Sequence, residues 1–126
     1  MKNLNLIKRV IALSIIIVFF TFPSQALAPW AGLWGKVRHA NGTFTSPSDN
    51  ITVKTMYNGD EIVTTVDDWN GQGSYRFENS WTWTGGTFNI VARDPAWHVG
   101  SVNVYFPGGA TMTQAPDIYL SAVSAY

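Results

Sequence analysis

The side chains best suited to contact a ligand in this sequence are its tryptophans. Six occur in 126 residues, and two of them, Trp81 and Trp83, are separated by a single threonine. In an extended loop, residues i and i+2 lie on one side, so the two indoles would form a flat apolar strip on which a sugar ring can stack. The alternative is that both rings fold back and cap an open end of the domain. The sequence leaves both interpretations open.

Two further tryptophans are candidates for the same surface. Trp34 has the same strand parity as Lys36 and the opposite parity to Val37, so we expect it on an outer face. Trp69 lies in a turn-rich loop and could join a surface patch. Trp97 follows a proline-containing turn, and we expect it to be packed rather than exposed.

One loop concentrates oxygen-bearing side chains. Asp67, Asp68, Asn70 and Gln72 place four oxygen-bearing side chains within six residues, a composition that suits a hard cation such as calcium. The distal bidentate glutamate of a calcium loop is missing, and Asp, Asn and Gly are also the residues that turns use. Asp67, Asp68 and Asn70 are therefore a weak metal candidate beside the simpler interpretation of a solvated turn, and we expect no cofactor.

Catalytic constellations are missing from the sequence. His39 and His98 are the only histidines, neither belongs to a zinc-protease motif, and the chain has no cysteine. The adjacent Asp67 and Asp68 do not indicate two carboxylates held apart across a cleft, as glycoside hydrolysis requires. We therefore predict no catalytic residue and a protein that is not an enzyme.

Composition narrows the class of partner. Charged residues make up 13% of the chain and apolar residues 46%, which is enough for a buried core. Eight basic residues balance eight acidic ones and are scattered along the sequence, so the chain has no basic footprint for nucleic acid. Without cysteine there are no disulfides, and core packing has to supply the stability.

The first 26 residues have the composition of a secretory signal peptide. Lys2, Lys8 and Arg9 precede an uncharged, almost wholly apolar run, residues 10–22, that ends at Pro23. Thirteen helical residues reach only about 20 Å, short of a bilayer core of roughly 30 Å, so we expect no retained membrane span. Small residues favour cleavage after Ala26, with cleavage after Ala28 as the second choice.

Removal of that segment changes the charge and indicates the compartment. The remaining chain keeps five basic residues against all eight acidic ones, a net charge of −3. We expect a protein secreted to the extracellular space, the periplasm or the cell surface, with a domain over residues 30–121 and a C-terminal tail over 122–126.

The rest of the chain predicts short strands. Gly, Pro, Asn and Asp recur every eight to twelve residues, and no long stretch has helical periodicity, a pattern typical of an all-β sandwich. Asn58-Gly59 between two apolar runs is a strong hairpin signal. Seven strands are predicted: Leu33 to His39, Ile51 to Tyr57, Glu61 to Val66, Ser74 to Glu78, Thr87 to Arg93, Trp97 to Phe106 and Asp117 to Leu120.

Alternation along these strands predicts two packed antiparallel sheets. The residues expected to face the core are Ile51, Val53, Ile62, Thr64, Val66, Tyr75, Phe77, Phe88, Ile90, Ala92, Val102, Val104, Phe106, Ile118 and Leu120. Charged residues fall on the opposite parity, as strands with one solvated face require. The predicted architecture is a seven-stranded antiparallel two-sheet sandwich.

The order of motifs resembles a known family. Gly35-Lys36-Val37, Gly73-Ser74-Tyr75-Arg76-Phe77, Gly86-Thr87-Phe88-Asn89-Ile90 and Pro116-Asp117-Ile118-Tyr119-Leu120 are similar to stretches of the carboxypeptidase regulatory-like and Cna-B-like domains. The resemblance covers about residues 32–121 and implies a transthyretin-like sandwich, a carbohydrate-binding-like fold. It also implies a non-catalytic module that serves as a spacer, adhesive or carbohydrate-contacting unit. The connection Glu78 to Gly85 is longer here than is usual in the family.

Some Cna-B relatives carry an internal cross-link between side chains, so we ask whether this sequence has the residues to form one. Lys36, Asp117 and Glu78 occupy strands that the resemblance associates with that chemistry. Lys36 alternates with Val37, and Asp117 with Ile118, which directs both side chains away from the dry core that the cross-link needs. We therefore expect no cross-link.

These observations favour a secreted binding module whose ligand is carbohydrate or a cell-surface glycan or protein. Trp81, Trp83, Trp69 and Trp34 are the predicted contact residues. The alternative is a structural subunit of an extracellular filament, pilus or matrix, because open sheet edges can accept a strand from another copy. The apolar tail over residues 121–126 could be such an added strand.

Overall fold

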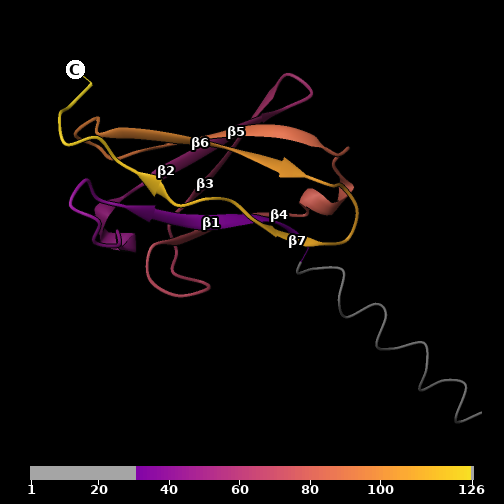
Figure 1. Cartoon of the computed structure of the whole chain (residues 1–126), viewed down its shortest axis with the longest axis horizontal. Helices are drawn as coiled ribbons and strands as arrows, with labels where there is room; N and C mark the ends of the chain where they lie inside the picture. Colours follow the sequence, from indigo (N-terminus) through magenta and orange to yellow (C-terminus); the bar gives the residue numbers. More distant parts are fainter. Residues whose placement is uncertain (1–30, 126) are drawn as a thin grey trace, which may run out of the picture.

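The computed structural model describes residues 31–125, so the predicted signal segment lies outside the described residues. This part of the chain is mostly β, with about 48% of the described residues in strands and almost no helix. Two sheets pack face to face as the layers of a sandwich (Figure 1). The expectation of an all-β, two-sheet architecture is confirmed. In the described part, no helix has the length and apolar character to cross a membrane.

Each sheet has four strands. The first sheet is built around the central strand β1 (Gly32–Arg38), with β4 (Ser74–Glu78) on one side and β7 (Met112–Gln114) and β8 (Ile118–Tyr119) on the other. The second sheet has the order β3 (Asp60–Thr65), β2 (Thr52–Tyr57), β5 (Gly86–Arg93), β6 (Val99–Phe106). Two short 3-10 turns, η2 (Pro47–Asp49) and η3 (Ser80–Thr82), lie in the connections.

The prediction of a seven-stranded antiparallel sandwich was wrong in two particulars. The described part has an eighth strand, β7, whose three residues are too few to show alternation in the sequence. Both β7 and β8 run parallel to β1, with Gly32 beside Met112 and Val37 beside Ile118. The chain reaches these positions by crossing from one sheet to the other after β6.

The hairpin between β2 and β3 forms where the sequence predicts it. Asn58 has φ 51° and Gly59 has φ 83°, the two positive values that a type I′ turn requires. The strands then pair in register from Tyr57 with Asp60 to Thr52 with Thr65.

The faces of the strands follow the predicted alternation. The buried apolar residues that were predicted to face inward are Ile51, Val53, Val66, Tyr75, Phe77, Phe88, Ile90, Ala92, Val104, Phe106, Ile118 and Leu120. Ile62 and Val102 are partly buried and pack against this core. Leu33 and Val37 of β1 complete the core from the first sheet.

Tyr75 brings a polar atom into the core. Its ring is fully buried, and among the described residues its hydroxyl has no hydrogen-bond partner. The hydroxyl packs against Gly35, where an added Cβ would lie 2.6 Å from it. Burial, and after it the negative charge of Asp117, raises the pKa of Tyr75 well above its ordinary value.

Removing this hydroxyl should not weaken the protein. We expect Tyr75→Phe to raise the free energy of unfolding by about 1 kcal/mol, because a buried hydroxyl without a partner costs desolvation energy and returns no hydrogen bond. Urea denaturation of wild type and variant measures the difference. A loss of 1 kcal/mol or more would mean that the hydroxyl is bonded in solution.

The C-terminal tail packs on its own sandwich. The amide of Leu120 donates to the carbonyl of Arg38 at 2.9 Å, and the amide of Ser121 donates to the carbonyl of Val99 at 3.0 Å. Farther along, the amide of Ala125 donates to the carbonyl of Trp97 at 2.7 Å. The tail therefore connects β1 of one sheet to the start of β6 in the other, along the side where Figure 1 shows it in yellow.

Candidate functional site

Trp81 and Trp83 do not form a common strip. The loop after β4 contains the short turn η3, which begins after Asn79 in the left-handed conformation (φ 62°), so the loop is not extended there. Trp81 is 37% exposed, whereas Trp83 is half-buried. The geometry needed for a shared stacking surface is therefore missing.

Trp83 packs over one end of the core and covers it. Its ring stacks on Tyr57 with centroids 5.1 Å apart and planes 15° apart, and it lies 5.2 Å from Phe88 and 6.2 Å from Phe77. The Tyr57 hydroxyl accepts a hydrogen bond from the backbone amide of Thr84 at 2.9 Å, which holds the loop over the sandwich end. Of the two interpretations of this tryptophan, the capping one agrees with its position.

Trp34 and Trp69 come together on the outer face of the first sheet. Their rings meet edge to face, with centroids 5.6 Å apart. Trp34 pairs in register with Arg76 of β4, and the Arg76 guanidinium lies 5.1 Å from the centroid of the Trp69 ring. The indole nitrogen of Trp69 donates to the carbonyl of Tyr75 at 3.2 Å, which fixes the loop against β4. Both tryptophans are half-buried by these contacts.

A polar hollow adjoins this aromatic pair. The Arg76 Nε lies 3.0 Å from Glu78 Oε1 and 3.8 Å from Asp67 Oδ2. These three side chains, with Val63 and Phe77 among others, line a hollow of about 300 Å³ between β3 and β4. We call Trp34, Trp69, Arg76, Asp67 and Glu78 the aromatic–ionic cluster.

The loop that carries Trp69 uses its acidic residues for its own backbone. Asp67 Oδ1 accepts from the amide of Trp69 at 3.2 Å, and Asp68 Oδ1 accepts from the amide of Gly73 at 2.8 Å. The backbone amide of Asn70 donates to the hydroxyl of Ser74. Within residues 31–125, no three His, Cys, Asp or Glu side chains are placed to hold a metal ion.

The three residues that a Cna-B-type cross-link would use, Lys36, Glu78 and Asp117, contact other side chains. Asp117 forms an ion pair with Arg38 at 2.7 Å, and Glu78 pairs with Arg76. The Lys36 ammonium lies 4.9 Å from the centroid of the Phe44 ring. These contacts are on the outer face of the first sheet, away from the core.

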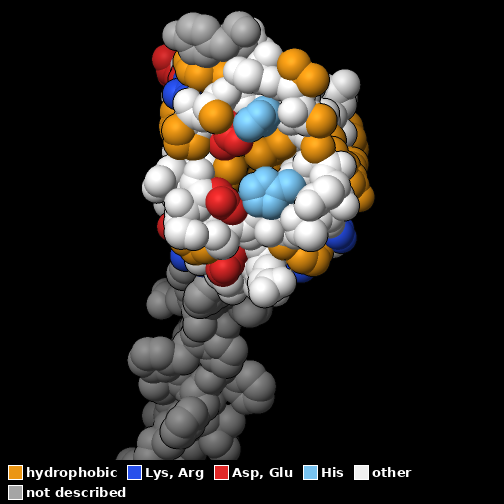
Figure 2. Space-filling view, turned by 90° about the vertical axis from the view of Figure 1, so that its left-hand side faces the viewer, with side chains coloured by type: hydrophobic (Ala, Val, Ile, Leu, Met, Phe, Trp, Pro, Cys, Tyr) orange, Lys and Arg blue, Asp and Glu red, His pale blue; other side chains and the backbone are white. Residues whose placement is uncertain are grey.

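The two histidines meet at the end of the sandwich that Figure 2 faces, a juxtaposition that the sequence reasoning missed. His39 follows β1, and its Nε2 lies 3.2 Å from Asp49 Oδ2 in η2. His98 precedes β6, and its Nδ1 lies 2.6 Å from Asp94 Oδ2. Figure 2 shows both imidazoles at the surface beside acidic side chains, on either side of a hollow with hydrophobic side chains at its floor.

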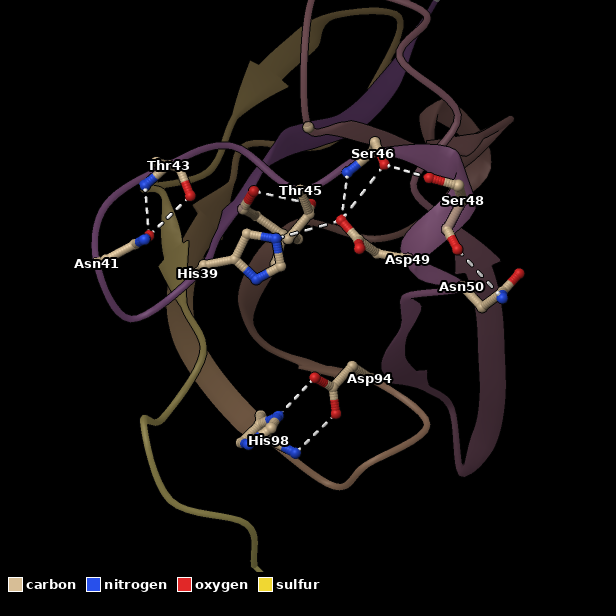
Figure 3. Close-up of polar contacts among 12 residues, drawn as sticks. His39, Asn41, Thr43, Thr45, Ser46, Ser48, Asp49, Asn50, Asp94 and His98 are labelled. Atoms are coloured by element: carbon tan, nitrogen blue, oxygen red, sulfur yellow. Dashed lines mark hydrogen bonds and ion pairs between the residues drawn. The ribbon is translucent and has the colours of Figure 1, made fainter.

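This histidine pocket has a volume of about 370 Å³. It is lined by His39, Ala40, Asn41, Asp94, His98, Leu120, Ser121 and Ala122. Leu120 and Ala122 near the C-terminus supply most of the apolar lining, and the loops after β1 and β5 supply His39, Asn41, Asp94 and His98. Figure 3 shows His39 and His98 on opposite sides of the same open space.

Asp94 is held ionised by its neighbours. Burial raises its pKa, but the hydrogen bonds from the His98 ring and amide, the charge of His98 and the Ala96 backbone together lower the pKa of Asp94 below its usual value. One local signal was available in the sequence. An acid and a histidine four residues apart around a proline turn can close on each other, as Asp94 and His98 do.

Trp97, in that turn, is more exposed than expected. It is 39% exposed and has a positive φ of 65°. The Arg93 guanidinium lies 4.4 Å from the centroid of its ring.

Comparison with known proteins assigns the chain to no family. No protein-family profile matches the chain, and no curated protein matches it either.

Proposed function

We propose that this chain is a secreted, non-catalytic β-sandwich module of the carboxypeptidase regulatory-like type that binds carbohydrate. The aromatic–ionic cluster and the hollow beside it are the proposed contact surface. Under this proposal, Trp69 and Trp34 supply the aromatic contact, and Trp81 and Trp83, the other two candidates, stand outside it.

The observation that carries the proposal is the position of Trp69 beside Arg76. The guanidinium lies 5.1 Å from the indole centroid and at the same time 3.0 Å from Glu78. A pyranose has an apolar face and a rim of hydroxyls, so it is recognised by an aromatic surface flanked by charged hydrogen-bonding groups. Arginine and carboxylate side chains make the stronger, charge-assisted hydrogen bonds to such hydroxyls.

A retention assay on insoluble polysaccharides tests the proposal. Wild type is expected to bind at least one of cellulose, chitin and peptidoglycan. Trp69→Ala should lose most of the bound fraction, because its affinity should fall at least tenfold. Arg76→Met should weaken binding as well, because it keeps the apolar stem and removes the charged donors.

Trp81→Ala is the matched control, since it also removes an indole but lies outside the cluster. Circular dichroism establishes that each variant is folded. Equal retention of wild type, Trp69→Ala and Trp81→Ala would remove the cluster as a binding surface.

A second function, assembly into a filament or matrix by strand addition, is favoured by one observation. β6 is an edge strand of eight residues without a single charge, and β5 pairs with only one of its edges. The tail and β8 contact the start of β6, so a free edge over residues 101–106 could accept a strand. Light scattering separates the two functions: the binding module stays a monomer, whereas the assembling subunit forms large species as its concentration rises.

A further inference from the structure

We propose that the histidine pocket is a second binding site, specific for a primary ammonium group. This inference is independent of the carbohydrate proposal, because the pocket and the aromatic–ionic cluster share no residue. It rests on the hydrogen-bonding state of the two imidazoles and on the charges around them.

The Asp partners determine which ring nitrogens remain as acceptors when the imidazoles are neutral. A carboxylate only accepts hydrogen bonds, so the ring nitrogen beside it carries the proton in a neutral imidazole. His98 therefore donates through Nδ1 to Asp94, and His39 donates through Nε2 to Asp49. The remaining nitrogens, His98 Nε2 and His39 Nδ1, keep lone pairs, and within the described residues neither nitrogen forms a hydrogen bond.

The charges around the pocket favour a cation. Asp49 and Asp94 bring two negative charges when the imidazoles are neutral. The cationic side chains next in sequence to the lining have other partners: Arg38 pairs with Asp117 at 2.7 Å, and Arg93 lies against Trp97. An anion would meet lone pairs and carboxylates, whereas a cation with several N–H groups would find acceptors on both sides.

A primary ammonium group fits this arrangement. It has three N–H donors, enough for an imidazole nitrogen and two further acceptors or waters. The volume of about 370 Å³ accommodates a small molecule, and Leu120 and Ala122 provide an apolar surface for its carbon skeleton. The absence of a three-ligand cluster in the described part disfavours a bare metal ion.

The same geometry makes binding depend on pH. Protonation converts the two acceptors into donors and adds two positive charges at the pocket rim. Asp94 remains ionised at pH 5.0, since its pKa is lowered.

Propylammonium is the probe for the primary ammonium group, which amino sugars and lysine side chains share. Nitrogen-detected NMR of the imidazoles is expected to show saturable shifts of His39 Nδ1 and His98 Nε2 at pH 7.2, with at least tenfold weaker binding at pH 5.0. Tetramethylammonium, which has the charge but no N–H donor, should leave both signals unchanged. Glucosamine and N-α-acetyl-lysine amide distinguish a sugar-borne amine from a protein-borne one, and N-acetylglucosamine is the uncharged control for the sugar.

Two variants remove one acceptor each and preserve the bond to aspartate. His98→Asn keeps an N–H near the Nδ1 position and removes Nε2, and His39→Gln keeps one near Nε2 and removes Nδ1. Each is expected to weaken propylammonium binding at least tenfold. Glu61→Gln removes a carboxylate from the outer face of the second sheet and should have no effect.

The proposal fails if propylammonium causes no saturable shift in the wild-type protein, or if tetramethylammonium binds as well. It also fails if folded His98→Asn and His39→Gln both bind with wild-type affinity. Should either variant unfold, the comparison of the two ammonium probes on wild type still decides the question. Neither result depends on whether the polysaccharide assay succeeds.

Discussion

Trp83→Ala is expected to lower the free energy of unfolding by about 3–5 kcal/mol, the cost of removing a large packed aromatic side chain. Trp83 stacks on Tyr57 and contacts Phe88 and Phe77, so the truncation leaves a hole at one end of the core. Its loss also frees the loop that Thr84 anchors to the Tyr57 hydroxyl.

Trp81→Ala is the control for this measurement, because it deletes an indole two residues away that is 37% exposed and outside the core. We expect its effect to be below about 1 kcal/mol. Urea denaturation followed by far-ultraviolet circular dichroism avoids reliance on tryptophan fluorescence. Equal effects of the two substitutions would show that the cap contributes nothing specific to stability.

The second large effect is expected at Gly100, where β6 lies in close contact with β8. A Cβ built there would lie 2.2 Å from the carbonyl oxygen of Tyr119 and 2.9 Å from Cγ2 of Ile118. Backbone cannot move aside as a flexible side chain does, so Gly100→Ala should push β8 off the sandwich and cost about 3 kcal/mol. Hydrogen exchange at the Leu120 and Ser121 amides should accelerate in parallel, since both bonds hold this segment.

Gly86→Ala provides the matched control for a glycine in a strand. Gly86 lies in β5, and an added Cβ there meets nothing within 4 Å. We expect it to stabilise the protein by about 0.5 kcal/mol, because alanine restricts the unfolded chain more than glycine does. A Gly100→Ala protein as stable as Gly86→Ala would mean that β8 is not packed on β6 in solution.

Local patterns in the sequence were sufficient for the strands and their faces. Asn58-Gly59 determines a hairpin through backbone conformations that few other residue pairs adopt. Alternation then assigned Tyr75, Phe77 and Ile90 to the core, because the period of two is a property of each strand alone.

The candidate sites depended on contacts that no local pattern contains. Trp83 turns inward because Asn79 adopts a left-handed conformation and starts a 3-10 turn, while the loop residues alone were equally compatible with an extended strip. Trp34 and Trp69 are brought together by a loop that returns to β4. His39 and His98 lie far apart in the sequence, and only the closure of both sheets at one end places them around a common pocket.

The position of β1 has a consequence for when the chain can fold. Among the described strands, β1 leaves the ribosome first and is the central strand of its sheet, whereas two of its three neighbours, β7 and β8, are made last. Contacts of such long sequence separation form slowly and cannot form during most of synthesis. Until residue 119 has emerged, β1 has no partner on that edge. The first sheet therefore stays open along β1 until residue 119 has been made, and a chaperone can engage a strand edge that is exposed in this way.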